Sequence, residues 1–147
     1  MSAEQYELPG EWWTAPADAE NGNLIMVTGR DDVDTFRNNP RFTTLYTITW
    51  SYHAGASGMP DDADAETMQQ VTEALARELK KDPVAVMTGI FTGDGQRNWV
   101  FYTLSPHILT RKLNEVTAHL PLLPLELSAE SDPDWAAYDE MAQLRPE

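Results

Sequence analysis

Between Phe42 and Tyr52, large apolar side chains alternate with small polar ones. The large residues are Phe42, Tyr46, Ile48, Trp50 and Tyr52, and the small polar residues are Thr43, Thr47, Thr49 and Ser51. Successive side chains of a β-strand point to opposite faces of the sheet, so this spacing predicts a strand with one face on a core. The rest of the chain must supply the cover for that apolar face.

A helix is predicted after this strand. The segment from Asp64 to Lys81 carries an apolar stripe at helical spacing, made of Met68, Val71, Leu75 and Leu79. Aspartates gather at its start and lysines at its end, which is the order that the helix dipole favours. Asp82-Pro83 ends the helix, because the residue before a proline is pushed out of the helical region.

Two strands, a second helix and a last strand follow. Val84 to Thr92 and Arg97 to Thr103 are rich in β-branched and aromatic residues, and Gly93-Asp94-Gly95 between them predicts a hairpin turn. Ser105-Pro106 is typical of a helix start. The apolar stripe of this second helix is Leu109, Leu113, Val116 and Leu120, and the last strand is predicted over Leu122 to Leu127.

From Phe42 onward the predicted order is strand, helix, strand, strand, helix, strand. This order is typical of the ferredoxin-like βαββαβ plait. We therefore expect an α+β fold with a four-stranded antiparallel sheet and both helices on one face. Asn21-Gly22-Asn23, between Trp12–Pro16 and Leu24–Thr28, predicts an added N-terminal β-hairpin. Asp31 to Asn38 suits a short helix, and Asp132-Pro133 predicts the start of an added C-terminal helix.

The length of 147 residues predicts a single domain over residues 1–147, with a core from about 12 to 140 and loose ends. Cysteine is absent, which excludes disulfides and thiolate metal sites. The first residues lack the pattern of a signal peptide, and no apolar run has the length of a membrane helix. A cytoplasmic location is the simplest expectation.

The chain is strongly acidic. It has 24 Asp and Glu residues against 10 Lys and Arg, a formal net charge of −14. Such a surface repels phosphate groups, so we expect neither nucleic-acid nor membrane binding. The acids are concentrated in residues 1–40 and 126–147. Two interpretations stay open: a charged coat that keeps the protein soluble, or an acidic face that docks on a basic partner.

No motif for chemistry stands out. The three histidines lack the spacing of metal ligands, and neither a nucleophile elbow nor a phosphate-binding loop occurs. The aspartate clusters fit helix starts better than a calcium loop. We therefore expect no cofactor, no metal and no catalytic residue. One alternative pocket combines His53, at the end of the first strand, with Asp61 and Asp62 across a glycine loop.

The aromatic residues are unusually many for this length. Trp12 and Trp13 are adjacent on a predicted strand, so they must point to opposite faces. Arg97, Trp99 and Phe101 share one face of the hairpin strand, opposite to Val100 and Tyr102. Such residues are either core or interface anchors.

Three motifs together carry a family resemblance. They are Asp94-Gly95-x-Arg97-x-Trp99-x-Phe101-Tyr102, Gly58-Met59-Pro60, and Asp132-Pro133-x-Trp135-x-x-Tyr138. Because all three motifs occur together, the chain resembles the bacterial domain-of-unknown-function 695 family, and the resemblance extends from about Trp12 to Tyr138. The resemblance implies a small soluble bacterial domain without an assigned activity, and no catalytic residues to carry over. Some members are joined to a domain similar to a regulator of ribonuclease E activity, which implies a regulatory or binding role.

The function we expect is a non-enzymatic, acidic binding module that engages a basic protein, as an inhibitor or immunity protein does. The candidate partner-binding residues are Trp12, Trp13, Arg97, Trp99, Asp132, Trp135 and Tyr138. Two alternatives remain: a small enzyme or ligand-binding domain that uses the loop after Tyr52, and a structural domain that self-associates. The protein is thus expected to be a monomer or a homodimer.

Overall fold

The computed structural model describes residues 10–146, and all statements about the fold refer to these. The predicted N-terminal loose segment lies almost wholly outside them. At the other end, Arg145 pairs with Asp31 at 2.9 Å, so this part of the C-terminal end is held. The strands are β1 (Trp12–Asp18), β2 (Leu24–Arg30), β3 (Thr44–Ser51), β4 (Ala85–Gly93), β5 (Gln96–Thr103) and β6 (Leu125–Ser131). The helices are α1 (Asp34–Arg37), α2 (Asp62–Lys81), α3 (Pro106–Val116) and α4 (Ala136–Ala142).

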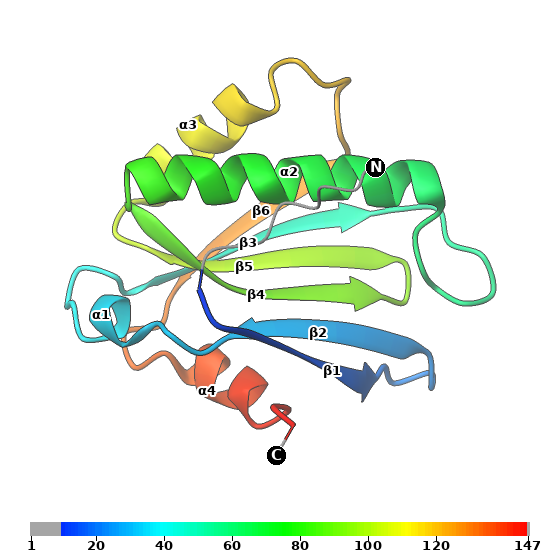
Figure 1. Ribbon diagram of the computed structural model, residues 1–147, viewed down its shortest axis with the longest axis horizontal. Helices are drawn as coiled ribbons and strands as arrows, with labels where there is room; N and C mark the ends of the chain where they lie inside the picture. The colour runs from blue at the N-terminus through cyan, green and yellow to red at the C-terminus, as the bar shows by residue number, and fades with distance from the viewer. Residues whose placement is uncertain (1–9, 147) are drawn as a thin grey trace.

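The strands form one antiparallel sheet in the order β1-β2-β4-β5-β3-β6 (Figure 1). The predicted α+β class and antiparallel sheet are confirmed. The predicted number of four strands is wrong, because the N-terminal hairpin does not stay separate. Strand β2 pairs with the outer edge of β4, from Ile25 opposite Gly93 to Gly29 opposite Gly89, and so extends the sheet to six strands.

Helices α2 and α3 cover one face of the sheet. Their apolar stripes pack on alternate residues of β3, β4 and β5 in one buried cluster. Trp99 and Phe101 are fully buried there, and Nε1 of Trp99 donates a hydrogen bond to Oγ1 of Thr72 at 2.7 Å. The predicted core face of the strand Phe42–Tyr52 is present at Tyr46, Ile48, Trp50 and Tyr52. The prediction is wrong for Phe42, which precedes β3 and packs in the cluster on the opposite face.

Helix α4 covers part of the opposite face. Trp135 and Tyr138 pack there with Val27, Leu45 and Tyr102 in a second buried cluster. The rings of Tyr102 and Trp135 stack at 4.0 Å with an interplanar angle of 7°. The sheet is therefore covered on both sides, by α2 and α3 on one and by α4 on the other.

Several predicted boundaries are wrong, among them the end of the last strand, which is Ser131 instead of Leu127. Helix α3 ends at Val116, so Leu120 lies beyond it. Strand β6 begins at Leu125 instead of Leu122, directly after Pro124, which has no N–H to donate to a sheet. Helix α4 begins at Ala136 instead of Pro133, because Trp135 takes a left-handed φ of 57° that a helix cannot contain.

Candidate functional site

Strand β6 forms one free edge of the sheet (Figure 1). It pairs with β3 on one side only, and the strand order ends with it. Every residue of β6 after Leu125 is exposed. Natural edge strands are commonly protected by lysine, proline or a bulge. The sequence Leu-Glu-Leu-Ser-Ala-Glu-Ser of β6 contains no lysine or proline, and its pairing with β3 is regular.

The backbone groups that face outward can be identified from the ladder. The N–H of Asp132 donates to the carbonyl of Thr43 at 2.8 Å, so the even-numbered residues of β6 direct their N–H groups towards β3. The N–H and C=O groups of Leu127, Ala129 and Ser131 therefore point to the free edge. They are positioned to pair with a further strand.

The two faces of β6 carry different side chains. Glu126 lies opposite Thr49 and Glu130 opposite Leu45, on the same face of the sheet as α4. Leu125 and Leu127 lie on the other face, beside α3. A strand that pairs with this edge would therefore meet two carboxylates on one face and two leucines on the other.

A partly exposed leucine patch continues from β6, in which Leu120, Leu123 and Leu125 are half-buried against the core under α2 and α3. We use the name leucine patch for Leu120, Leu122, Leu123, Leu125 and Leu127. Together with α3 they line a shallow cavity of about 490 Å³. Leu122 is 100% exposed and Leu127 is 42% exposed. Contiguous exposed apolar side chains of this kind mark sites of protein interaction.

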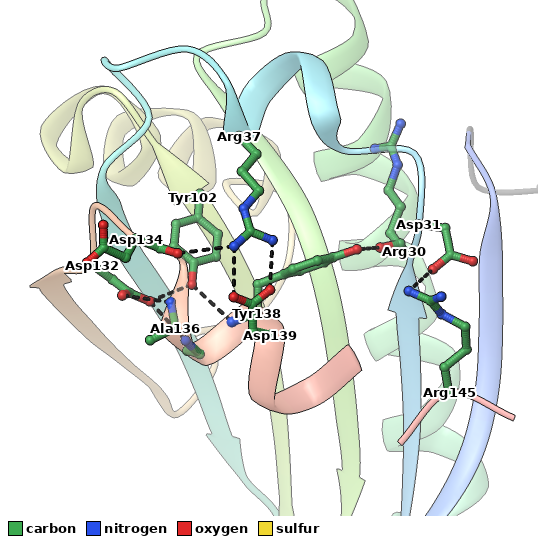
Figure 2. Close-up of polar contacts among 11 residues, drawn as sticks. Arg30, Asp31, Arg37, Tyr102, Asp132, Asp134, Ala136, Tyr138, Asp139 and Arg145 are labelled. Carbon is green, nitrogen blue, oxygen red and sulfur yellow. Dashed lines mark hydrogen bonds and ion pairs between the residues drawn. The ribbon is translucent and has the colours of Figure 1, made fainter. Parts of the chain in front are cut away.

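A polar network fixes the C-terminal end of β6 (Figure 2). The hydroxyl of Tyr102 donates to Oδ2 of Asp132 at 2.6 Å, and the same carboxylate accepts from the backbone N–H groups of Ala136 and Ala137. Nε1 of Trp135 donates to the carbonyl of Phe42 at 2.8 Å. Asp132 therefore ties the first turn of α4 to the sheet. Its predicted N-cap position is wrong, because the helix begins at Ala136 and its N-cap residue is Trp135.

Arginine and tyrosine contacts extend this network to α1 and β2 (Figure 2). Arg37 binds Asp139 with two hydrogen bonds, at 2.7 and 2.8 Å, and the hydroxyl of Tyr138 donates to the carbonyl of Arg30 at 2.6 Å. Burial, together with the hydrogen bond to Asp132, raises the pKa of Tyr102. These groups are paired with one another, which favours a structural role for the network.

The pKa of Asp132 follows from its partners. Burial alone would raise it, but the hydrogen bonds from Tyr102 and from the amides of Ala137 and Ala136 lower the pKa below 3.8. The carboxylate is thus held ionised in the folded protein.

A second hollow, of about 890 Å³, lies on the sheet face that α2 and α3 cover, between α2 and the strands β1, β2, β4 and β5. We call it the α2 cleft. Arg97 of β5 and Met59 and Pro60 of the loop before α2 line it. Two of the three sequence motifs therefore meet at this cleft. The loop is held to the hairpin turn, because the N–H of Gly95 donates to the carbonyl of Gly58 at 2.9 Å.

The structure does not bring the predicted partner-binding residues together at one surface. Trp99 and Trp135 are almost fully buried and Tyr138 is 7% exposed, so a partner on the surface would not reach the rings of these three. Trp12 and Trp13 are half-buried and pack on opposite faces of the sheet, as predicted. Of the remaining two, Asp132 belongs to the network at the end of β6 and Arg97 to the α2 cleft.

The alternative pocket around His53 is not assembled. His53 is exposed, and its side chain makes no hydrogen bond or ion pair with the described residues. Oδ1 of Asp61 accepts from the N–H of Asp64 at 2.8 Å and so caps α2. Asp62 lies exposed in the first turn of that helix. Over residues 10–146 no cluster of three or more metal-ligating side chains is present.

The sequence analysis missed the free edge of β6 and the leucine patch. One signal was available: Leu125, Glu126 and Leu127 begin an apolar and charged alternation that is typical of a strand with an exposed face. Alternation does not show whether a strand is central or at an edge, since that depends on the order of all the strands.

The fold and the site define an α+β protein with an open antiparallel sheet and an exposed acidic edge strand. A family model described as a family of unknown function, DUF695, matches residues 11–141. The chain belongs to this family, and the resemblance seen in its motifs is confirmed. Searches of curated proteins and of solved structures found no match. In the part of the chain that the structure describes, no helix has the length and apolarity to cross a membrane.

Proposed function

We propose that the protein is a non-enzymatic, acidic regulatory module that binds a basic protein, and that β6 is its docking surface. The observation that carries this proposal is the exposed outer edge of β6, with the outward N–H and C=O groups of Leu127, Ala129 and Ser131. An extended segment of a partner can add to such an edge as a further strand. Backbone hydrogen bonds then provide affinity, and the side chains provide specificity.

The side chains of β6 define the partner segment. Glu126 and Glu130 lie on one face and favour lysine or arginine at alternate positions of the added strand. The leucine patch on the other face favours apolar residues at the positions between. The net charge of −14 accelerates the encounter with a basic protein.

A basic partner fits this edge better than a second copy of the chain does. Two copies of β6 that pair over their full length, centred on Ser128, place Glu126 of one copy opposite Glu130 of the other. Like charges directly opposite each other destabilise an antiparallel pair. We therefore propose the heterologous complex, and the homodimer is an outcome that the test below would reveal.

We also propose a more specific fold than the α+β class, and a location for the protein. The order β4-β5-β3-β6, with α2 and α3 as crossovers on one face, supports a ferredoxin-like plait to which the β1–β2 hairpin is added. The absence of cysteine agrees with a bacterial cytoplasmic location.

The docking proposal is tested with an extended peptide that alternates lysine and valine. NMR titration of the labelled protein should shift the amide resonances of β6, saturably and less strongly at high salt. Ala129→Pro removes one outward N–H and should weaken binding at least tenfold, whereas Ala129→Ser retains the N–H and should bind as the parent does. Three results would contradict the docking proposal. They are shifts confined to α2, equal binding by both variants, and a concentration-dependent dimer without peptide binding.

A further inference from the structure

The α2 cleft contains an arginine without a counter-ion. Nε of Arg97 is buried and has no hydrogen-bond partner, and no carboxylate pairs with this side chain among the described residues. The guanidinium lies 5.5 Å from the ring centroid of Trp99. Burial lowers the pKa of Arg97 to about 10. A charged group that is desolvated and unpaired destabilises the fold.

The other cations of this chain that are buried or half-buried, Arg30, Arg37 and Lys112, are paired with carboxylates. Arg30 binds Asp32, Arg37 binds Asp139, Arg145 binds Asp31, and Lys112 contacts both Glu78 and Asp82. Among the described residues, four cations also form no ion pair but are exposed to water: Arg41, Lys80, Lys81 and Arg111. Arg97 differs from them because its Nε is buried and still has no partner. An arginine in this position is available to an anion that enters from outside.

The walls of the cleft offer suitable contacts for a small molecule. Thr92 is the cross-strand neighbour of Arg97 on β4, and Thr28 and Gln69 also line the cleft. Met26 and Ile90 add apolar surface. A mostly preformed hollow with a few polar groups around one charge is the usual form of a small-molecule site.

We propose that the α2 cleft binds a small organic anion, whose carboxylate or phosphate group pairs with Arg97 and whose apolar part lies against Met26 and Ile90. A guanidinium matches both oxyanions through paired N–H donors. Glu73, on the α2 wall, disfavours ligands that carry further negative charge near it. This site is on the opposite face of the sheet from Glu126 and Glu130, and it does not depend on the docking role of β6.

The test uses benzoate, phenyl phosphate and neutral benzamide as probes on the full chain. Binding is followed by NMR through the Nε–H resonance of Arg97 and the indole resonance of Trp99. We expect saturable shifts of both resonances with at least one anion and none with benzamide. The two anions distinguish a carboxylate from a phosphate ligand. Equal shifts with benzamide, or no shift with either anion, would overturn the proposal.

Two variants test whether the charge of Arg97 binds a ligand or stabilises the fold. Arg97→Met retains apolar volume and should weaken anion binding at least tenfold, while its thermal midpoint stays the same or rises. Arg111→Met makes the same charge change on an exposed part of α3 and should bind as the parent does. A lower midpoint for Arg97→Met, or unchanged anion binding by it, would show that the charge of Arg97 does not serve a ligand.

Discussion

The packing around Trp135 holds its backbone in an unfavourable conformation. The φ of 57° at Trp135 is in the left-handed region, which a bulky residue enters at a cost of about 1–3 kcal/mol. The stack on Tyr102 and the hydrogen bond from Nε1 to the carbonyl of Phe42 offset that cost. The sequence motif around Trp135 and Tyr138 left open whether these two rings are core or interface, and the structure buries both in the second cluster. The motif could not predict the left-handed turn, which arises from tertiary packing.

Tyr102→Phe tests the polar network at the end of β6. The substitution leaves the ring stack in place and removes the hydroxyl that donates to Asp132. The same hydroxyl accepts from the N–H of Tyr138 at 3.2 Å, so the substitution removes two hydrogen bonds. We expect the free energy of unfolding to fall by about 2 kcal/mol or more, since one of the two has a charged acceptor. The control is Tyr46→Phe, which loses only a neutral contact with Thr110 at 2.7 Å and should cost about 1 kcal/mol. Chemical denaturation measures both, and equal losses would argue against a special contribution of Asp132.

The lowered pKa of Asp132 predicts a dependence of stability on pH. A carboxyl whose pKa is lower in the folded state stabilises the fold above its unfolded pKa, and this contribution is lost as the pH falls through the folded value. The parent should therefore lose stability on acidification from about pH 5 more steeply than Asp132→Asn does. Denaturation curves between pH 5 and 3 measure the two slopes. Equal slopes of stability against pH for the two proteins would contradict the lowered pKa of Asp132.

At the scale of elements, hydrophobic periodicity predicted most of the fold. The alternation in Phe42–Tyr52 and the stripe on α2 each correspond to an observed element. The N-cap predicted at Ser105 is present, since its hydroxyl accepts from the N–H of Ile108. The place where β2 joins the sheet was not predictable in the same way. Pairing between β2 and β4 depends on contacts far apart in the sequence, which local periodicity does not contain.

Two leucine substitutions, one in the leucine patch and one in α3, distinguish residues that serve docking from residues that stabilise the fold. Leu122→Ser removes a fully exposed side chain and should change the free energy of unfolding by less than about 0.5 kcal/mol. Leu113→Ala empties a buried position on the neighbouring helix and should cost about 2–5 kcal/mol. Only the first substitution should weaken binding of the lysine–valine peptide without loss of fold. A large destabilisation by Leu122→Ser would show that the patch belongs to the core.

At the scale of the whole molecule, charge governs how a partner arrives. The net charge of −14 predicts that the association rate with the basic peptide falls about tenfold or more from low to high ionic strength. The dissociation rate should change much less, because backbone hydrogen bonds and leucine contacts hold the complex. Stopped-flow kinetics with a fluorescent peptide measure both rates. An association rate that is independent of salt would contradict electrostatic steering.

Hydrogen–deuterium exchange at the amides of Leu127, Ala129 and Ser131 tests the docking role of β6 most directly. These three N–H groups point to the free edge and should exchange rapidly in the free protein. On saturation with the lysine–valine peptide their exchange should slow by at least tenfold, while the amides of β1 at the other edge stay unchanged. Binding that leaves these three amides unprotected, or that protects β1 instead, would contradict strand addition at β6.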